Sequence, residues 1–370
     1  MAEYKICANC IMDTSDPEIT FDQNNVCNHC LNYRKRAAKE LKDRKELQEL
    51  VCKIKKKGWG KKHDCLIGLS GGVDSSTVAF LLFELGLRPL AINLDNGWNA
   101  GQSERNIAKI VRHLNLDLIT YKLDWIEFSD LQKAFLKASV VNAEIPTDHA
   151  IMALLFKTAV KNKIKYVISG GNIVTEAVMP DSWGYDSKDL KYLKSVYKRF
   201  GTGELESFPV LSNFDWIYNA FFRKIKCIPI LNYTDYSRES AKHRLKQEIG
   251  WEDYGLKHGE SIYTRFFQNY ILPKKFGIDK RRAHFSNLIC SGQMTREKAL
   301  EEIKKTPYEN WELEQKEKNY VINKLGFEDQ EFERIMSLPK RPDKEIPNNC
   351  FWYKRLNFLI KLTRKKITNN

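Results

Sequence analysis

The residues of this chain whose types and spacing point most directly to chemistry form one loop: Ser70, Gly71, Gly72, Val73, Asp74, Ser75 and Ser76. They follow an apolar run, 65–69, that predicts a buried strand, and precede apolar residues at helical spacing up to Gly86. A strand that turns through two glycines into a helix directs backbone N–H groups and the positive end of the helix dipole at one point. The pattern therefore predicts a phosphate site.

The residues around Asp74 indicate which kind of phosphate site this is. The loop is not a Walker A motif, because no Gly-Lys-Ser/Thr follows and the lysine that would reach the terminal phosphates is missing. Asp74 lies beside the expected anion, an arrangement that is favourable when Mg²⁺ bridges the carboxylate to phosphate. The alternative is a glycine-rich turn that binds no ligand.

Four cysteines near the N-terminus have the spacing of a metal site: Cys7, Cys10, Cys27 and Cys30. Two C-x2-C pairs separated by sixteen residues predict two tight knuckles whose thiolates complete a tetrahedral zinc site. Because all four positions are thiolates and none is left for substrate, we expect the zinc to be structural. Four free cysteines, or a redox pair, are the alternative.

Two further apolar runs end in polar or glycine-rich residues. Asp95 and Gly97 follow the run 89–94, and Gly170 and Gly171 follow the run 166–169, with Glu176 shortly after. In a parallel sheet the carboxyl ends of the strands meet at one crevice, where ligands bind. We therefore expect these residues to flank the same nucleotide as the loop, although Asp-Asn-Gly is also an ordinary turn.

A cluster of charged residues late in the chain offers the cations that the loop lacks: Lys257, His258, Glu260, Arg265, Lys280, Arg281 and Arg282. Releasing pyrophosphate and holding an acidic substrate both require fixed positive charges. We expect Lys280 and Arg281 to act in catalysis and the others to contact substrate. A solvated charged turn is the alternative.

The elements that position these residues alternate between strand and helix. Strand, helix and strand within about thirty residues imply a right-handed crossover, so we predict an α/β fold with a doubly wound, mainly parallel sheet. We also expect one helix over 32–57, a short strand over 16–22, and a loop that covers the substrate over 179–211. We predict three regions, namely a zinc ribbon with a linker helix (1–60), a catalytic domain (61–290) and a helical C-terminal region (291–370).

Composition limits the class of protein. The chain has no apolar run of about 18 residues and a polar N-terminus, so we expect neither a transmembrane helix nor a signal peptide, and a cytoplasmic protein. The net charge of +14 is concentrated in 34–62 and 354–370. Basic helical stretches are typical of RNA, anionic membrane or acidic-partner binding, and equally of solvated helix faces.

The string Ser-Gly-Gly-Val-Asp-Ser-Ser at 70–76 resembles the PP-loop of the ATP pyrophosphatases, of the adenine nucleotide alpha hydrolase-like fold, which adenylate a carbonyl oxygen and release pyrophosphate. The segment 95–97 is similar to the one that borders the adenosine in GMP synthetases. The segment 170–176 is similar to the one whose glutamate binds metal in relatives of NAD synthetase. The resemblance implies that Asp74 and Glu176 hold Mg²⁺. It also places Asp148 and His149 near substrate, although a helix cap explains that tetrapeptide as well.

Three segments together resemble the N-acetyl sugar amidotransferase family: the four-cysteine ribbon, residues 254–268 and residues 276–296. The resemblance implies synthesis of bacterial surface glycans, in lipopolysaccharide O-antigen or in pseudaminic or legionaminic acid. In such enzymes ATP adenylates the oxygen of an acetamido group, and ammonia displaces AMP to leave an acetamidino group. This activity makes the chain an AMP-forming C–N ligase that uses ATP, Mg²⁺ and structural Zn²⁺.

The source of ammonia is expected to be a partner. A glutaminase of the N-terminal-nucleophile type needs Cys at the mature N-terminus, but Ala2 follows Met1. The family resemblance implies partners similar to the glutaminase and barrel subunits of imidazole-glycerol-phosphate synthase.

Three other interpretations were weighed. Zinc-ribbon PP-loop enzymes also thiolate tRNA, but the cysteines outside the ribbon are scattered, so nucleic acid is the second choice. A ribbon scaffold with a dead nucleotide site is disfavoured by the intact Asp74, Asp95 and Glu176. The apolar and basic stretch 350–366 is typical of a helix on the inner membrane surface, although core packing or a subunit contact is the preferred expectation.

Overall fold

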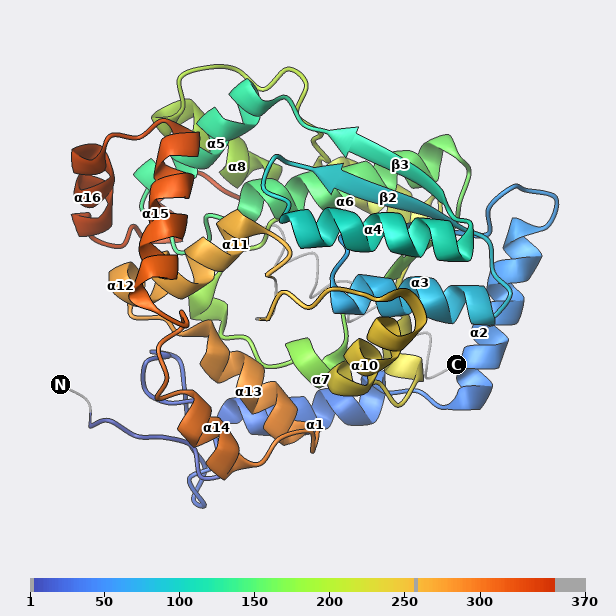
Figure 1. Ribbon diagram of the computed structural model, residues 1–370, viewed down its shortest axis with the longest axis horizontal. Coiled ribbons are helices and arrows are strands. Elements are labelled where there is room, and N and C mark those ends of the chain that lie inside the picture. The colour runs from blue at the N-terminus through green and yellow to red at the C-terminus, as the bar shows by residue number, and fades with distance from the viewer. Residues whose placement is uncertain (1–2, 256–258, 350–370) are drawn as a thin grey trace.

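The computed structural model describes residues 3–255 and 259–349, and its centre is a five-stranded parallel sheet (Figure 1). The strand order is β3-β2-β1-β4-β5. The strands are β1 Cys65–Gly68, β2 Pro89–Asp95, β3 Asp117–Lys122, β4 Tyr166–Ser169 and β5 Lys226–Pro229. The chain builds outward from β1 through β2 to β3 and then returns to the other side of β1. The order therefore reverses between β1 and β4, which is where open α/β sheets bind ligands.

Both faces of the three inner strands β1, β2 and β4 are buried, because alternate residues of these strands enter different apolar clusters, whereas the edge strand β3 is largely exposed. In β1, Cys65 and Ile67 pack in one cluster and Leu66 in the other. In β2, Ala91 faces the first cluster, whereas Leu90 and Ile92 face the second. Covering both faces explains why the strands are continuous apolar runs without polar alternation. The predicted doubly wound α/β fold is confirmed.

Helices cover the two faces unequally. One face carries α2 Arg44–Gly58, α3 Val73–Glu84, α4 Gly101–Leu114 and α10 Arg238–Ile249. The other carries α6 Ile145–Lys161. Figure 1 shows α3 and α4 running alongside each other, with α10 against α3. Helix α2 packs on this sheet through Leu47, Leu50 and Ile54. It therefore shares a core with the sheet, although the predicted boundary at residue 60 places it in the N-terminal region.

A third apolar cluster joins the N-terminal cysteines to the C-terminal helices. Besides residues of α6 and of two helices named below, α1 and α7, its helical elements include α5 Trp125–Lys137, α8 Leu190–Phe200, α11 Ile262–Phe266, a π-helix Phe267–Ile271, α12 Leu272–Phe276, α13 Lys280–Cys290, α15 Trp311–Leu325 and α16 Asp329–Ser337. The remaining helices are α1 Asn28–Glu40, α7 Ile173–Glu176, α9 Asn213–Phe221 and α14 Arg296–Glu302. Short 3-10 turns lie at Asp181–Trp183, Ile230–Tyr233 and Asp343–Glu345. Helix α13 packs on α1, so the C-terminal region is built against the ribbon.

Three local predictions were wrong. The expected helix 32–57 is two helices, because Asp43 and Glu46 form a capping box that starts α2 anew. The expected strand 16–22 is a turn, in which the buried carboxylate of Asp16 accepts bonds from Ser182 Oγ and His29. The expected loop 179–211 contains α8, which buries Tyr192 and Leu193 against α5.

Across 3–255 and 259–349, no helix has the length and apolar character needed to cross a membrane. The predicted amphipathic stretch 350–366 lies outside the described residues.

Candidate functional site

The loop that joins β1 to α3 adopts a shape that requires glycine. Gly71 has a φ of +76°, and a Cβ on it would lie 2.3 Å from the carbonyl oxygen of Ser103. The loop is braced from outside by one segment after α10. Trp251 Nε1 donates to the Gly71 carbonyl at 3.0 Å, and the hydroxyl of Tyr254 accepts from the N–H of Val73 at 2.9 Å. The loop is therefore rigid before any ligand arrives.

The loop lines a cavity of about 170 Å³, which we call the loop cavity. Its walls come from the loop, the tip of β4 and the region after α10. They are Ser70, Gly72, Val73, Asp74, Ser75, Gly170, Glu176, Arg238, Tyr254 and Glu260. A Cβ on Gly170 would lie 3.3 Å from the backbone of Asp74, so a glycine at the tip of β4 allows this close approach. The cavity therefore lies at the reversal of strand order between β1 and β4.

Three carboxylate residues line the loop cavity, namely Asp74, Glu176 and Glu260, and the first two are the predicted magnesium ligands. Asp74 and Glu176 both line it, and the hydroxyl of Tyr236 donates a hydrogen bond to Asp74 Oδ1. Hard carboxylate oxygens beside a phosphate site fit Mg²⁺, which keeps several waters and uses one or two carboxylates together with phosphate oxygens. Burial raises the pKa of Tyr236, and the neighbouring Asp74 adds to the shift, so the phenol remains a donor. The residues present therefore fit the predicted magnesium ion.

A larger space of about 610 Å³, the central cavity, adjoins the loop cavity and shares Ser70, Gly170, Glu176 and Glu260 with it. Its apolar wall is formed by the strand ends and α6, including Ile92, Leu94, Met152, Leu155 and Ile168. Its polar wall includes Asn96, Asn99, Glu144, Thr147, Asp148, Thr264, Gln268 and Lys280. An apolar wall opposite a few convergent polar groups is typical of a small-molecule site.

The polar wall of the central cavity contains one connected charge group. Glu144 is only 9% exposed, and its Oε2 accepts from Lys280 Nζ at 3.2 Å and from Gln268 Nε2 at 3.0 Å. Gln268 lies in the π-helix 267–271, an irregular turn that is frequent at functional sites. Glu144, which is itself held by Gln268, thus fixes the cation of Lys280 at the cavity wall.

The structure brings many of the predicted site residues together. Those that line one or both cavities are Ser70, Gly72, Asp74, Ser75, Asp148, Gly170, Glu176, Glu260 and Lys280. Gly71 shapes the loop, and Ser76 is buried with its hydroxyl donating to the Gly72 carbonyl at 2.7 Å. Asp95 lies at the end of β2, where its Oδ1 accepts from Gly97 N at 2.9 Å. Their roles in ATP binding remain predictions, and Lys257 and His258 lie outside the described residues.

Two predicted substrate contacts are corrected by the structure. His149 is buried with both ring nitrogens engaged, since Nδ1 lies 2.7 Å from the Ser187 carbonyl and Nε2 accepts from Leu211 N at 3.1 Å. Arg265 forms an ion pair with the buried Glu317 of α15, so it holds α11 in place. Neither residue lines the loop cavity or the central cavity of about 610 Å³ along α6.

Arg281 and Arg282 are also structural. Arg281 forms a bidentate pair with Asp279 and donates to the Lys305 carbonyl at 2.8 Å. Arg282 pairs with Asp13 at 3.0 Å and donates to the Ile11 carbonyl at 2.9 Å. Both arginines therefore take part in tertiary packing, and the catalytic role of Arg281 and the substrate role of Arg282 stay predictions.

Sequence reasoning missed several residues that line the cavities. Arg238, Tyr254, Glu144 and Gln268 all do so, and Tyr236 contacts Asp74. Arg238 is the first residue of a helix, and the sequence marks it only as a cation after the cap Ser237. Tyr254 and Gln268 are the two ends of the segment 254–268 that carries the family resemblance, whereas no motif marks Glu144 or Tyr236.

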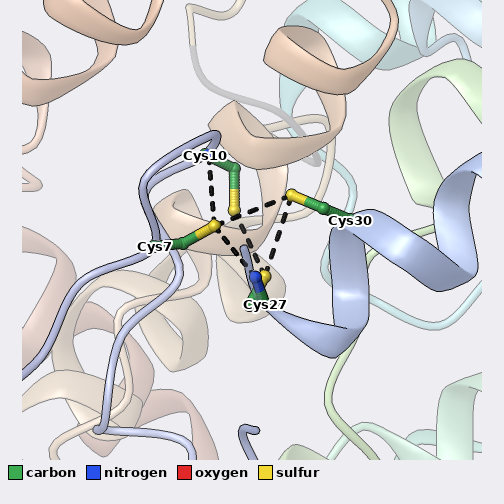
Figure 2. A group of neighbouring side chains, drawn as sticks. All are labelled: Cys7, Cys10, Cys27 and Cys30. Carbon is green, nitrogen blue, oxygen red and sulfur yellow. Dashed lines mark hydrogen bonds between the residues drawn. The ribbon is translucent and has the colours of Figure 1, made fainter. Parts of the chain in front are cut away.

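The N-terminal cysteines form a buried cluster that could hold a metal ion. Figure 2 shows the four side chains pointing toward one another, and all four are buried. The sulfur atoms of Cys7 and Cys30 are 3.9 Å apart, those of Cys10 and Cys27 are 3.6 Å apart, and those of Cys27 and Cys30 are 3.8 Å apart. A tetrahedron with zinc–sulfur bonds of about 2.3 Å has edges of about 3.8 Å. The sulfur positions therefore fit Zn²⁺ with no open coordination position.

Backbone and side-chain donors support this centre. The N–H groups of Cys10 and Cys27 donate to Cys7 Sγ at 3.4 and 3.2 Å, as expected for thiolates that need partial charge neutralisation. Arg296 of α14 donates to the carbonyl of Cys7 at 2.9 Å and to that of Cys10 at 3.1 Å. The ribbon is thus clamped to the C-terminal helices.

Two family models match the chain. Residues 45–207 match the model described as NAD synthase, and residues 260–359 match that described as LPS biosynthesis protein WbpG-like, C-terminal domain. Among curated proteins, an uncharacterized protein from Methanocaldococcus jannaschii is 31% identical over 130 residues, which cover 34% of this chain and 46% of that protein. The chain therefore spans about half the length of this curated relative.

Several solved structures are similar to the chain at low identity. An NH3-dependent NAD synthetase from Campylobacter jejuni is 19% identical, with 55% of this chain and 94% of that chain covered and a TM-score of 0.29. An NMN synthetase from Francisella tularensis is 16% identical, with 61% and 92% covered and a TM-score of 0.27. A predicted subunit of tRNA methyltransferase from M. jannaschii is 16% identical, with 49% and 73% covered and a TM-score of 0.28.

The order of the two family models agrees with the order of the structural regions. The NAD synthase match contains the loop and strands β1 to β4, and the WbpG-like match contains α11 to α16. The chain thus combines an NAD synthase-like PP-loop domain, of the kind that uses ATP, with a WbpG-like C-terminal domain of lipopolysaccharide biosynthesis, and this combination confirms the family resemblance predicted from the sequence.

Proposed function

We propose that the protein converts an acetamido group of a sugar into an acetamidino group in the synthesis of a bacterial surface glycan. The amide oxygen attacks the α-phosphorus of ATP, the bond to the β-phosphate breaks and pyrophosphate leaves. Ammonia then adds to the activated carbon, which expels AMP together with the former amide oxygen. One oxygen of the sugar is thus exchanged for an NH group, and one ATP yields AMP and pyrophosphate.

The observation that carries this proposal is the junction of the two cavities. The loop cavity has the backbone and carboxylates for the phosphates, and the adjoining central cavity has an apolar wall and polar groups for the other reactants. Because Ser70, Gly170, Glu176 and Glu260 belong to both, a nucleotide in one cavity places its α-phosphate beside the other. The match to a lipopolysaccharide biosynthesis domain supports a sugar as the second reactant.

The chain's own residues would perform positioning and charge stabilisation. Mg²⁺ held by Asp74 and Glu176 would neutralise negative charge on the phosphates when bound. Lys280, fixed by Glu144, presents a cation at the wall of the central cavity, where it can stabilise charge that develops at the reacting centre. The apolar wall excludes water, which would otherwise compete with ammonia for the activated carbon. The zinc centre, with four thiolates and no open position, is assigned a structural role.

Ammonia is proposed to come from a separate glutaminase subunit and to reach this chain through a barrel subunit. This part rests on the family resemblance.

Thiolation of tRNA is the second candidate, and one residue bears on it. Cys227 of β5 lines the central cavity, so a thiol is available there. No second cysteine lines the central cavity among the described residues, and the match to a lipopolysaccharide biosynthesis domain favours the sugar over tRNA.

The test is an assay of the full chain with ATP, Mg²⁺ and ammonium, offered a panel of acetamido sugars, free and nucleotide-linked, and separately tRNA. The proposal expects AMP to form in proportion to a sugar product that is lighter by the difference between oxygen and NH. AMP formation with tRNA, and with none of the sugars, would transfer the site to thiolation.

A further inference from the structure

One buried cation at the loop cavity forms no ion pair within 3–255 and 259–349. Arg238, the first residue of α10, is 8% exposed and lines the loop cavity beside Asp74 and Glu176. Three cations predicted from the sequence differ from it in this respect. Lys280 pairs with Glu144, Arg281 with Asp279 and Arg282 with Asp13.

The guanidinium of Arg238 has one unsatisfied donor. Its Nε is buried and has no hydrogen-bond partner, and within 3–255 and 259–349 no carboxylate lies at ion-pair distance from it. A buried charge without a partner is costly, so such groups are ordinarily paired or bind a ligand. A guanidinium that is left open toward a cavity therefore indicates that the missing partner is an anion in that cavity.

The neighbours of Arg238 place it at the loop. Tyr236 lies two residues before it and donates to Asp74, and Tyr254 accepts from the N–H of Val73. Burial raises the pKa of both phenols, and the nearby guanidinium opposes the shift in each. Arg238 is thus close to the two tyrosines that contact the start of α3.

We propose that Arg238 supplies the cation that the loop lacks, by binding the β- and γ-phosphate oxygens of ATP and then the pyrophosphate that leaves. A guanidinium is suited to this role because its planar fork forms two parallel hydrogen bonds to one phosphate and stays charged at any working pH. The loop has no lysine of its own, and Arg238 reaches the same cavity from α10, more than 160 residues away along the chain. This inference rests on the proposed function, in that it requires a nucleotide triphosphate in the loop cavity.

The experiment compares two ligands by calorimetry on the full chain: magnesium pyrophosphate, which would occupy only the phosphate site, and AMP, which lacks both outer phosphates. Arg238→Gln is expected to weaken pyrophosphate and ATP binding about ten- to a hundredfold, the effect of losing a charge-assisted contact, and to leave AMP binding unchanged. Arg238→Lys keeps the positive charge but loses the planar guanidinium that forms two parallel hydrogen bonds. It is expected to weaken pyrophosphate binding less than Arg238→Gln does.

The matched control is Arg244→Gln on the same helix. Arg244 is an exposed arginine that pairs with Glu84 and Glu248 and lines neither cavity, so its loss should leave pyrophosphate binding as in the wild type. Equal pyrophosphate affinity in Arg238→Gln and wild type would overturn the inference and leave the proposed function standing. A wild type that binds neither ATP nor pyrophosphate would overturn both. Should Arg238→Gln fail to fold, Arg238→Lys decides, since unchanged affinity in that variant would also refute the bidentate contact.

Discussion

The hydroxyl oxygen of Tyr254 accepts a hydrogen bond from the backbone N–H of Val73 at 2.9 Å, across 181 residues of sequence. Val73 is the first residue of α3, and its N–H is one of the donors that a helix start leaves without a partner inside the helix. Tyr254 therefore holds the first residue of α3 in place through this N–H group.

Tyr254→Phe is expected to lower the free energy of unfolding by about 1–2 kcal/mol, because the N–H of Val73 becomes a buried donor without its partner. Denaturant unfolding measures the loss, and the KM for ATP should rise with it, since the loop is no longer held. Tyr218→Phe, at a partly exposed tyrosine on α9, is the control and should change neither. Unchanged stability in Tyr254→Phe would show that the loop does not depend on this bond.

Asp74→Asn is expected to reduce turnover by at least about a hundredfold with little change in stability, because the amide keeps an acceptor for Tyr236 but loses the charge that binds Mg²⁺. Titration of activity with Mg²⁺ should show a higher requirement in the variant. Glu176→Gln tests the second carboxylate in the same way. Wild-type activity in both variants would remove the metal from this cavity.

Cys10→Ser is expected to lose zinc and destabilise the whole chain by several kcal/mol, since metal binding is coupled to folding and the ribbon shares a core with the C-terminal helices. Metal analysis should find about one zinc per wild-type chain. Cys52→Ser, at an exposed cysteine of α2, should keep both zinc and stability. A fully stable, zinc-free Cys10→Ser variant would contradict the structural assignment.

Acid should destabilise the fold through protonation of His149, whose two ring nitrogens contact the Ser187 carbonyl and the Leu211 N–H. Burial lowers the pKa of His149 below its usual value, so the folded state binds a proton less readily than the unfolded state. Stability is therefore lost as the pH falls below about 6.5, where the unfolded histidine becomes protonated. The free energy of unfolding of His149→Gln should be lower at pH 7.5 and depend less on pH between 7 and 5. Identical pH dependence in wild type and variant would refute this role.

The parts of the site that sequence predicted are those that short segments determine. The loop at 70–76 follows directly on a strand, contains two glycines and leads directly into a helix. The four cysteines are recognised from their spacing alone. The break between α1 and α2 was not predicted, although Asp43 and Glu46 have the spacing of a capping box.

The cations of the site were not determined by local sequence. Lys280, Arg281 and Arg282 are adjacent and chemically alike, yet they bind Glu144, Asp279 and Asp13, and two of these partners come from distant parts of the chain. Arg238 has no motif around it, and only the packing of α10 beside α3 brings it to the loop cavity. Which cation is free for phosphate is a property of the folded chain.

The most direct test of the account follows the amide oxygen. An acetamido sugar that is accepted in the activity assay is labelled with ¹⁸O at the acetamido oxygen and incubated with the full chain, ATP, Mg²⁺ and ammonium, and the AMP is analysed by mass spectrometry. The account predicts that the label appears in the phosphate of AMP, because the oxygen that attacks the α-phosphorus leaves with it. Unlabelled AMP, with the ¹⁸O recovered in water or retained on the sugar, would contradict adenylation of the acetamido group at the loop of residues 70–76.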